Sequence, residues 1–400
     1  MTGLIGSVEA FRRLRQAADD PLNYVGRWKA EHRQPVVGIF PMNFPVEIVH
    51  AAGALPVIIQ EDAEPITAGN NLLSEFNCGY TRNIADQAAM ARLGSYDAFV
   101  LADHCIQIFG AADVVREYYP DTPLIFSQLI SAMGDRWTTG EVMKSTRSFV
   151  SDLEGLFGKF ITSKDLQRSI VLFNENRRLQ RWLFDARRDG RLTIPAAAMQ
   201  VIVKSSMVMD IEEHSGLLRE IKSASERNSA DPDLIRLHLS GHFCHAPKPN
   251  LLDLIESAGA IVVDDDLYHG ARYISTDTPE NVPPLEGLAA WYLNRNVAIP
   301  CPTRVQNDVD WDAYLLQAIE KSGAEAIVVL MAKFCEPHML YYPELKRALE
   351  ERGVPHVLIE TEHEGLAAET VRTRIEAMLE RIRRARRAAA PHAAALSACS

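Results

Sequence analysis

Short apolar runs alternate with longer segments of helical periodicity through the first third of the chain. From residue 35 onward the runs PVVGIF, LPVIIQ, AFVLA and PLIFSQ are separated by such segments. Short continuous apolar runs are typical of strands buried on both faces of a parallel sheet, and the segments between them supply the crossover helices. The pattern predicts a helical segment over residues 1–34 and a first α/β domain over residues 35–140.

The pattern changes at about residue 141 and becomes purely helical, with an apolar face that includes Phe149, Leu153 and Phe157. Strand-like runs return as LIRLHLSG, AIVVDD, AIVVLM and HVLIE. We therefore expect a helical connector over residues 141–230 and a second α/β domain with a C-terminal helix over 231–385. The alanine-rich end, residues 386–400, is expected to be a disordered tail.

The two α/β segments also resemble each other, since HAAGALPVII and ESAGAIVVDD both pass from a helix through an Ala-Gly-Ala turn into a buried strand. Gly53 and Gly259 suit the ends of these helices. This loose repeat supports the fold and carries no chemistry of its own.

Composition and charge narrow the classes of partner. The 400 residues include 42 Lys and Arg against 53 Asp and Glu, a net charge of −11 that opposes binding to nucleic acid. The longest apolar stretches are far shorter than the roughly 20 residues of a membrane helix. The N-terminal sequence has no basic segment leading into an apolar core, so we expect no secretion signal and a cytoplasmic protein.

Six cysteines are present, at positions 78, 105, 244, 301, 335 and 399. None forms a C-x-x-C pair, which excludes the usual zinc ribbon, thioredoxin and ferredoxin arrangements. The sequence also lacks a P-loop, a G-x-G-x-x-G turn, H-E-x-x-H and G-x-S-x-G. The sequence therefore lacks the main motif of four common enzyme classes.

Two cysteines occupy matched positions in the two halves, because AFVLADHC leads to Cys105 and AIVVLMAKFC leads to Cys335. Ligands of open parallel sheets collect beyond the carboxyl ends of the strands, so both thiols are expected to face one cleft. Cys78, in SEFNCGYTRN, is the natural third member. Three such thiolates suit an iron–sulfur cluster with one open iron, or a three-coordinate metal site. The alternative for each is a small buried apolar side chain.

The remaining cysteines carry weaker signals. Cys301 lies between two prolines and is expected to pack, and Cys399 falls in the expected tail. Cys244 lies in GHFCHAP, where it could join two histidines around a metal. Adjacent residues of an extended loop point in different directions, which favours a cleft loop that contacts a ligand, or has no role. The candidates of this loop are Gly241, His242 and His245, and Gly241 would permit close backbone approach.

Several sequence blocks together resemble one family. The blocks PMNFPVEIVHAAGALPV, FNCGYTRN, DHCIQIFGAADVVREYYPD, LFNENRRL, SAGAIVVDDDLYHGARY and KFCEPHMLYYPELKRALEERGVPHVLIETEHEG resemble the 2-hydroxyacyl-CoA dehydratase D-component and benzoyl-CoA reductase subunit family. The likeness runs from about residue 25 to 385 in one register. It implies two Rossmann-like, flavodoxin-like parallel-sheet domains with a helical connector and a cluster in the cleft between them.

The resemblance also implies a cofactor and partners. Family members carry a [4Fe-4S] cluster on three cysteines, which match Cys78, Cys105 and Cys335. They pair with a homologous second subunit of the catalytic module, act on an acyl-CoA substrate and receive electrons from a separate ATP-hydrolysing iron–sulfur activator. The missing P-loop agrees with ATP being used by that activator rather than by this chain. Candidate proton-donating groups beside the cluster are His104, Lys333 and His338.

Within the family the chain is most similar to the smaller catalytic-module subunit of ATP-dependent benzoyl-CoA reductases. The expected reaction is dearomatising reduction of an aromatic acyl-CoA to a cyclic dienoyl-CoA by low-potential single-electron transfer. One alternative is a subunit of a (R)-2-hydroxyacyl-CoA dehydratase, which forms an enoyl-CoA. Others are a non-catalytic electron-relay subunit of either complex, and a zinc or redox-inert binding protein. The chain departs from many relatives at GHFCHAP and at ADHC, and these departures leave the substrate class open.

Overall fold

The computed structural model describes residues 8–41, 44–103, 105–225, 231–241 and 244–397. Three residues named in the sequence analysis, His104, His242 and Cys399, lie outside the described residues.

In the first half of the described chain, two N-terminal helices are followed by the strands of one parallel sheet. Its elements are α1 (Val8–Asp19), α2 (Pro21–His32), β1 (Val36–Ile39), α3 (Val46–Ala51), β2 (Leu55–Ile58), α4 (Gly69–Leu72), α5 (Gly79–Ala89), β3 (Ala98–Ala102), α6 (Ile106–Tyr118) and β4 (Leu124–Ser127). The strands pair in the order β2-β1-β3-β4, all parallel. Strands β1, β2 and β3 are buried at every residue, as their continuous apolar runs predict.

Helices then separate the two sheets along the chain: α7 (Thr138–Phe157), α8 (Ser163–Arg188), α9 (Ala196–Ser206) and α10 (Ile211–Ala224). The second sheet and its helices follow as β5 (Ile235–Gly241), α11 (Pro249–Ser257), β6 (Ala260–Asp265), α12 (Ala271–Ile274), α13 (Pro284–Ala298), α14 (Trp311–Ser322), β7 (Ala326–Ala332), α15 (Glu336–Glu351), β8 (His356–Thr361) and α16 (Ala368–Ser397). Its strand order is β6-β5-β7-β8, again all parallel.

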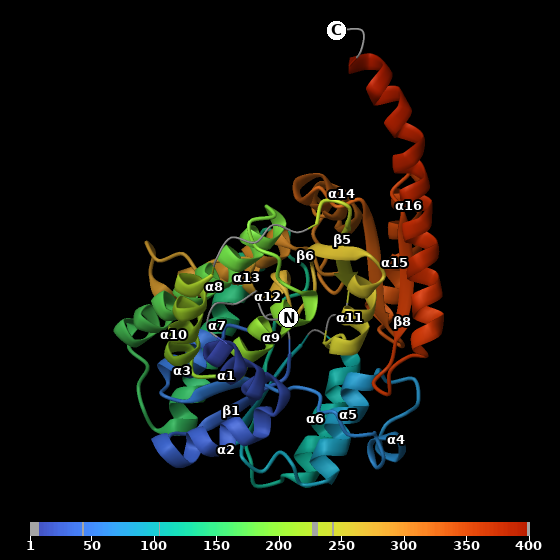
Figure 1. Cartoon of the computed structure of the whole chain (residues 1–400). Coiled ribbons are helices and arrows are strands. Elements are labelled where there is room, and N and C mark those ends of the chain that lie inside the picture. Colours follow the sequence, from blue (N-terminus) through green and yellow to red (C-terminus); the bar gives the residue numbers. More distant parts are fainter. Residues whose placement is uncertain (1–7, 42–43, 104, 226–230, 242–243, 398–400) are drawn as a thin grey trace.

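The two sheets therefore share one strand order, with β5–β8 in the places of β1–β4. This confirms the predicted α/β fold with two parallel sheets. Figure 1 shows β1 and its helices in the lower part of the molecule and β5, β6 and β8 in the upper right part, beside the long helix α16. The carboxyl ends of β3 and β7, the strands that precede Cys105 and Cys335, occupy equivalent positions in their sheets.

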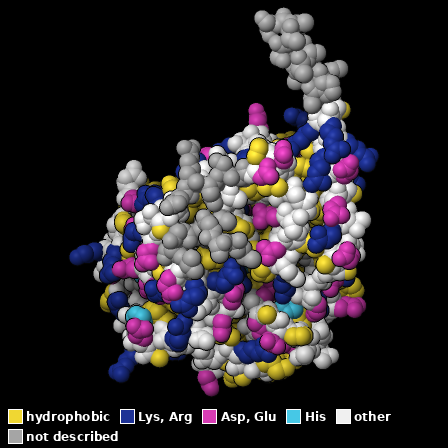
Figure 2. Space-filling view, in the orientation of Figure 1, with side chains coloured by type: hydrophobic (Ala, Val, Ile, Leu, Met, Phe, Trp, Pro, Cys, Tyr) yellow, Lys and Arg dark blue, Asp and Glu magenta, His cyan; other side chains and the backbone are white. Residues whose placement is uncertain are grey.

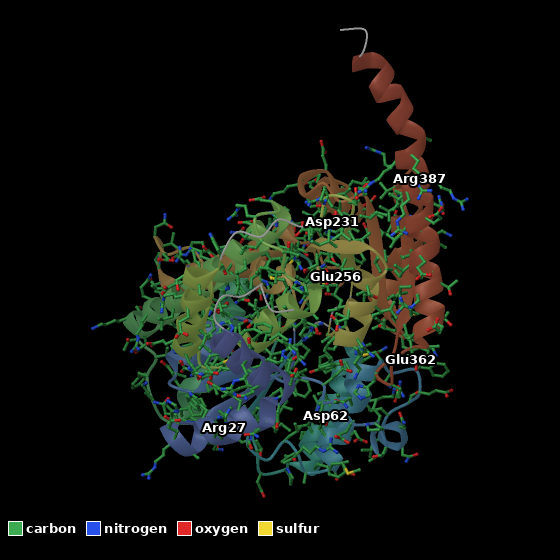
Figure 3. All side chains as sticks on the ribbon, viewed as in Figure 1. Arg27, Asp62, Asp231, Glu256, Glu362 and Arg387 are labelled. Carbon is green, nitrogen blue, oxygen red and sulfur yellow. The ribbon has the colours of Figure 1, made fainter. Side chains whose placement is uncertain are left out.

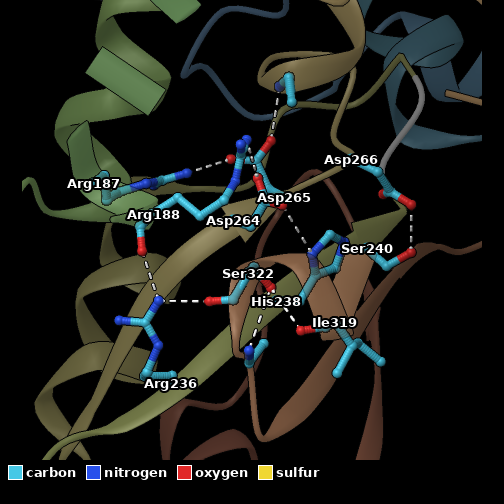
Figure 4. Close-up of polar contacts among 12 residues, drawn as sticks. Arg187, Arg188, Arg236, His238, Ser240, Asp264, Asp265, Asp266, Ile319 and Ser322 are labelled. Atoms are coloured by element: carbon cyan, nitrogen blue, oxygen red, sulfur yellow. Dashed lines mark hydrogen bonds and ion pairs between the residues drawn. The ribbon is translucent and has the colours of Figure 1, made fainter. Parts of the chain in front are cut away.

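Helix α8 is linked by buried ion pairs to helix α3 of the first half and to strand β6 of the second half. A capping box between Thr162 and Asp165 starts the helix. Near its middle, Arg177 donates to the buried Glu47 of α3 at 2.5 Å. At its end, Arg187 donates to Asp265 of β6 at 2.9 Å, as Figure 4 shows. A buried pair costs several kcal/mol when one partner is removed, so these contacts fix the connector against both halves.

Helix α16 continues to Ser397, into the segment where the sequence predicts a disordered tail. Arg386 at this boundary pairs with Glu325 at 2.5 Å, and alanine is the strongest helix former, so the helix is supported beyond residue 385. Within the described part of the chain, no helix is both long and apolar enough to cross a membrane. On the face shown in Figure 2, basic and acidic side chains are intermixed and form no patch of one sign.

Candidate functional site

The three cysteines predicted as ligands each stand immediately before a helix. Cys78 precedes α5, Cys105 precedes α6 and Cys335 precedes α15, each at the N-cap position. Cys105 and Cys335 both follow the last residue of their strand, Ala102 and Ala332, by three positions. The positive end of a helix dipole favours negative charge, so all three positions favour a thiolate or an anionic group bound to it.

The structure brings these thiols together in one cavity of about 220 Å³. It is lined by Cys78, Tyr80, Cys105, Ile106, Gln107, Ile108, Cys244, His245, Thr303, Ala332, Cys335, Glu336 and Pro337. Both α/β halves contribute to this wall. The sequence-based expectation that the cysteines of the two halves face one cleft thus agrees with the geometry.

One side chain links the three cysteine segments. Gln107, two residues after Cys105, accepts the backbone N–H of Cys78 at 2.8 Å through its Oε1 atom. Its Nε2 atom donates to the carbonyl of Phe334, the residue before Cys335, at 2.7 Å. Phe334 has a left-handed backbone, with φ of 65°, which turns the chain sharply from β7 into α15. Gln107 therefore holds the two halves in register at the cavity.

Burial dominates the electrostatics of the thiols. Burial raises the pKa of Cys78 to about 11, although the N–H of Thr81 favours the thiolate and lowers this pKa. It also raises the pKa of Cys105 and of Cys335, where the N–H groups of Ile108 and His338 act in the opposite direction. Burial therefore favours the protonated form of these thiols when no cation is bound. A coordinating metal deprotonates a thiol outright, so this set is suited to a metal-containing group rather than to a free nucleophile.

Glu61 connects the cavity to the second half of the chain. Its side chain is 8% exposed and lies 2.6 Å from Nδ1 of His245 and 3.0 Å from Nδ1 of His363. Burial alone would raise the pKa of Glu61, but the charge and hydrogen bond of His245, with the contact to His363, hold it well below its usual range. Figure 3 labels Asp62 and Glu362, the sequence neighbours of Glu61 and His363, where the two halves meet.

Two glycines permit close approach of protein backbone around the site. A Cβ on Gly79 would lie 2.9 Å from the Cβ and 3.0 Å from the backbone nitrogen of His363. Gly241 has φ of +107°, and a Cβ there would lie 2.1 Å from the carbonyl oxygen of Leu330. From the sequence, Gly241 is expected to allow close approach of a ligand, but the structure shows that the neighbouring strand β7 requires the glycine.

Of the predicted proton-donating groups, Lys333 and His338 fall within the described residues. Among the described residues that line the cavity, neither Lys333 nor His338 appears. Lys333 is exposed and pairs with Glu362. His338 is fully buried against the ring of Trp311, with ring centroids 4.8 Å apart, and burial lowers its pKa to about 3. Cys301 is buried and contacts the hydroxyl of Thr303 at 3.0 Å, as its predicted packing role requires.

Gln107 and Tyr80 are not predicted from the sequence, and Cys244 is left undecided there, although all three line the cavity. The only available signal is proximity in sequence, since Gln107 and Tyr80 each lie two residues after a predicted ligand. Tyr80 donates its hydroxyl to the carbonyl of Ile59 at 3.1 Å and so supports the wall.

The thiols do not form a site for a single ion. Within the ranges that the structure describes, no three His, Cys, Asp or Glu side chains are grouped so that they could hold one metal ion. A multinuclear iron–sulfur cluster spaces its thiolate ligands more widely than one ion does. The cavity, its thiols and the three helix N-termini fit an anionic cluster of that kind.

Comparisons with known proteins identify relatives over most of the chain. The family described as 2-hydroxyglutaryl-CoA dehydratase, D-component, matches residues 41–382. A benzoyl-CoA reductase subunit of Thauera aromatica is 25% identical over 83% of this chain and 86% of its own length. The (R)-phenyllactyl-CoA dehydratase beta subunit of Clostridium sporogenes is 24% identical over 92% of this chain and 98% of its own length. The lactoyl-CoA dehydratase beta subunit of Anaerotignum propionicum is 26% identical over 92% of this chain and 97% of its own length.

Proposed function

The chain belongs to the 2-hydroxyglutaryl-CoA dehydratase D-component family, and from this premise we propose that it is the iron–sulfur subunit of an ATP-dependent benzoyl-CoA reductase. In this proposal the complex reduces an aromatic acyl-CoA to a cyclic dienoyl-CoA by low-potential single-electron transfer. The similarity to the benzoyl-CoA reductase subunit of Thauera aromatica supports this choice.

The observation that carries the proposal is the shared cavity. Cys78, Cys105 and Cys335 come from three separate helix N-termini and from both halves of the chain, yet they line the same space of about 220 Å³. Three incidental thiols in a chain of this length have no reason to converge. These residues would hold a [4Fe-4S] cluster, which supplies reversible one-electron transfer when bound.

The chain's own groups have separate roles in this proposal. The helix N-termini offset the negative charge of the bound group, and Gln107 fixes the spacing of the cysteine segments. Among the described residues, His245 lines the wall of the cavity, whereas Lys333 and His338 do not. We assign to it the contact with a proton-carrying or substrate group, with its ring oriented by Glu61.

A heteromeric complex follows from the same proposal. The relatives are named as subunits, and exposed apolar side chains occur beside the cysteines. Ile106 is 73% exposed, Phe76 is 64% exposed and Leu340 on α15 is 81% exposed. A homologous second subunit would cover them and exclude water from the cavity. A separate ATP-hydrolysing iron–sulfur activator would supply the electrons.

The second candidate is the beta subunit of a (R)-2-hydroxyacyl-CoA dehydratase. It is favoured by coverage, since the phenyllactyl-CoA and lactoyl-CoA dehydratase subunits align over 92% of this chain, against 83% for the reductase subunit. The same cavity serves either chemistry. A further alternative, for either complex, is that this chain is a non-catalytic electron-relay subunit.

Iron analysis tests the cluster. The full chain, isolated without oxygen, is expected to contain a [4Fe-4S] cluster, and Cys78→Ser, Cys105→Ser and Cys335→Ser are each expected to deplete it. Cys301→Ser is the matched control, because this cysteine packs in the core. A colourless protein without iron, or full iron retention in the Cys335 variant, overturns the assignment.

Substrate comparison tests the reaction. The chain, its partner subunit and an activator are offered benzoyl-CoA and a 2-hydroxyacyl-CoA, and ATP-coupled oxidation of a reduced viologen is followed. Stoichiometric consumption of electrons with benzoyl-CoA supports the reductase. Release of an enoyl-CoA without net electron consumption identifies the dehydratase instead.

A further inference from the structure

A second cavity lies beside the cysteine cavity, with a wall made of other residues. Its volume is about 320 Å³, and both halves contribute: Ala63 and Pro65 come from the first half, and residues of the loops after β5 and β8 come from the second. Among the described residues, only His245 belongs to both walls. Figure 3 labels Glu362 on this wall, in the segment between β8 and α16. The cavity thus lies at the carboxyl edge of a parallel sheet, where ligands of such sheets collect.

His363 on this wall is held as a cation. Its Nδ1 atom lies 3.0 Å from Oε1 of Glu61, and its Nε2 atom lies 2.7 Å from the carbonyl oxygen of Glu64. Only a protonated imidazole donates from both nitrogens. Burial disfavours this charge, but the hydrogen bond and charge of Glu61 outweigh burial and raise the pKa of His363. A buried positive charge therefore borders the cavity.

Two lysines add further positive charge. Lys248, the half-buried N-cap residue of α11, lies on the cavity wall. Burial lowers the pKa of Lys204 of α9; the charges of Glu61 and Asp19 oppose this, and the charge of Lys248 adds to it. Within the part of the chain that the structure describes, no carboxylate forms an ion pair with either lysine, and Glu61 is already shared by two imidazoles. An anion in the cavity would relieve the repulsion among these cations.

The rest of the wall limits the charge and the polarity of the ligand. Glu364 is exposed on this wall, and Glu362 beside it forms an ion pair with Lys333. These carboxylates disfavour a multiply charged group such as a phosphate. Leu366 is 41% exposed, and Val371 continues the apolar surface. A ligand with one negative charge and an apolar body matches both parts of the wall.

We propose that this cavity binds a small organic carboxylate, with its charged group against Lys248 and His363 and its apolar body on Leu366 and Val371. The site is distinct from the cysteine cavity, although an occupant would reach the shared side chain of His245. The inference does not depend on the proposed function, because none of these residues is a proposed cluster ligand.

Isothermal titration calorimetry of the full chain with sodium benzoate tests the site and needs neither iron nor turnover. We expect saturable binding to one site with a Kd below about 1 mM. Benzamide has the same shape without the charge, and inorganic phosphate has charge without the apolar body. Both are expected to bind at least about tenfold more weakly than benzoate. Equal binding of either probe overturns the choice of a carboxylate, and absence of saturation with benzoate overturns the site.

Two pairs of variants locate the bound benzoate. Lys248→Met is expected to weaken binding at least about tenfold, whereas Lys346→Met, at an exposed ion pair of α15, should leave it unchanged. Ala368→Trp is expected to abolish binding by filling this cavity, and Ile106→Trp, on the wall of the cysteine cavity, should leave it intact. Loss of binding in the Ile106 variant but not in the Lys248 variant overturns the location. Displacement of benzoate by coenzyme A would make the cavity part of an acyl-CoA site and would overturn the proposal as well.

Discussion

The side chain of Gln107 accepts the backbone N–H of Cys78 at 2.8 Å, across 29 positions of the sequence. The same amide donates to the carbonyl of Phe334 at 2.7 Å, 227 positions away. One half-buried glutamine thus sets the separation of the segments that carry Cys78 and Cys335. An amide is suited to this task, because it offers an acceptor and a donor at the same time.

Gln107→Leu is expected to loosen the cysteine cavity without unfolding the chain, since it removes both hydrogen bonds. At about 1 kcal/mol for each of the two bonds, iron release to a chelator should become about thirtyfold faster. Gln107→Glu separates the two contacts, because a carboxylate still accepts from Cys78 but cannot donate to Phe334. We expect an intermediate rate for it. Equal rates in all three proteins would contradict this role.

Gly79→Ala is expected to destabilise the protein by about 1–3 kcal/mol, because the added methyl group meets the backbone of His363. Gly26→Ala in α2 is the matched control, since nothing lies within 4 Å of its added Cβ. There the helix propensity of alanine should stabilise the protein by about 0.5–1 kcal/mol. Urea unfolding measures both, and the same sign for the two variants would refute the close contact.

Glu61→Gln is expected to change how stability depends on pH. The pKa of Glu61 is lowered from 4.5, so its contribution is complete above pH 4.5 and is lost as the pH falls toward its folded value. Burial disfavours the charged form of His363, and the charge of Lys248 also lowers the pKa of this histidine. The hydrogen bond and charge of Glu61 outweigh both and raise the pKa of His363 above 6.5. The contribution of His363 is complete below pH 6.5 and is lost as the pH rises through its folded value.

The stability difference between the wild type and Glu61→Gln should therefore be largest between pH 4.5 and 6.5. We expect about 1–3 kcal/mol there, because glutamine leaves buried imidazoles without a charged partner. Urea titrations at pH 5.5 and 8.5 measure the difference. Glu64→Gln, at an exposed neighbouring site, is the control and should show no such dependence. A pH-independent difference for Glu61→Gln would rule out the ionic contact.

Lys333→Ala is expected to change stability by less than about 0.5 kcal/mol, because its ion pair with Glu362 is exposed. Its iron content and turnover with the partner should stay within about twofold of the wild type, since Lys333 is exposed and is not among the described residues that line the cavity. Loss of turnover at normal iron content would support Lys333 as the proton-donating group suggested by its place beside Cys335.

Leu340→Glu is expected to prevent co-purification with the homologous subunit, because it places a charge on an apolar side chain exposed beside the cysteines. Phe160→Glu, at a similarly exposed residue between α7 and α8, is the control and should leave the complex intact. The elution volume of the co-expressed subunits on size exclusion measures both. An intact complex with the Leu340 variant places the interface elsewhere.

The sequence by itself determined the two parallel sheets. Strands such as β1 and β7 are short apolar runs buried along their whole length, and a local pattern is enough to predict them. It also predicted that Cys105 and Cys335 end equivalent strands, because position after a strand is a property of the chain order. The sequence also offered Cys78 as the natural third member, and the family resemblance implies the same three cysteines.

Only the tertiary structure decided which other side chains reach the cavity. Gln107 and Phe334 are joined across 227 positions, and Glu61 and His363 across 302, so no local pattern contains either contact. Burial is likewise decided by the tertiary structure: Lys333 and His338 flank Cys335 in sequence, yet Lys333 is exposed and His338 is fully buried. Cys244 joined the three thiols because β5 and β7 are neighbours in the sheet, and strand order is set by packing rather than by sequence proximity.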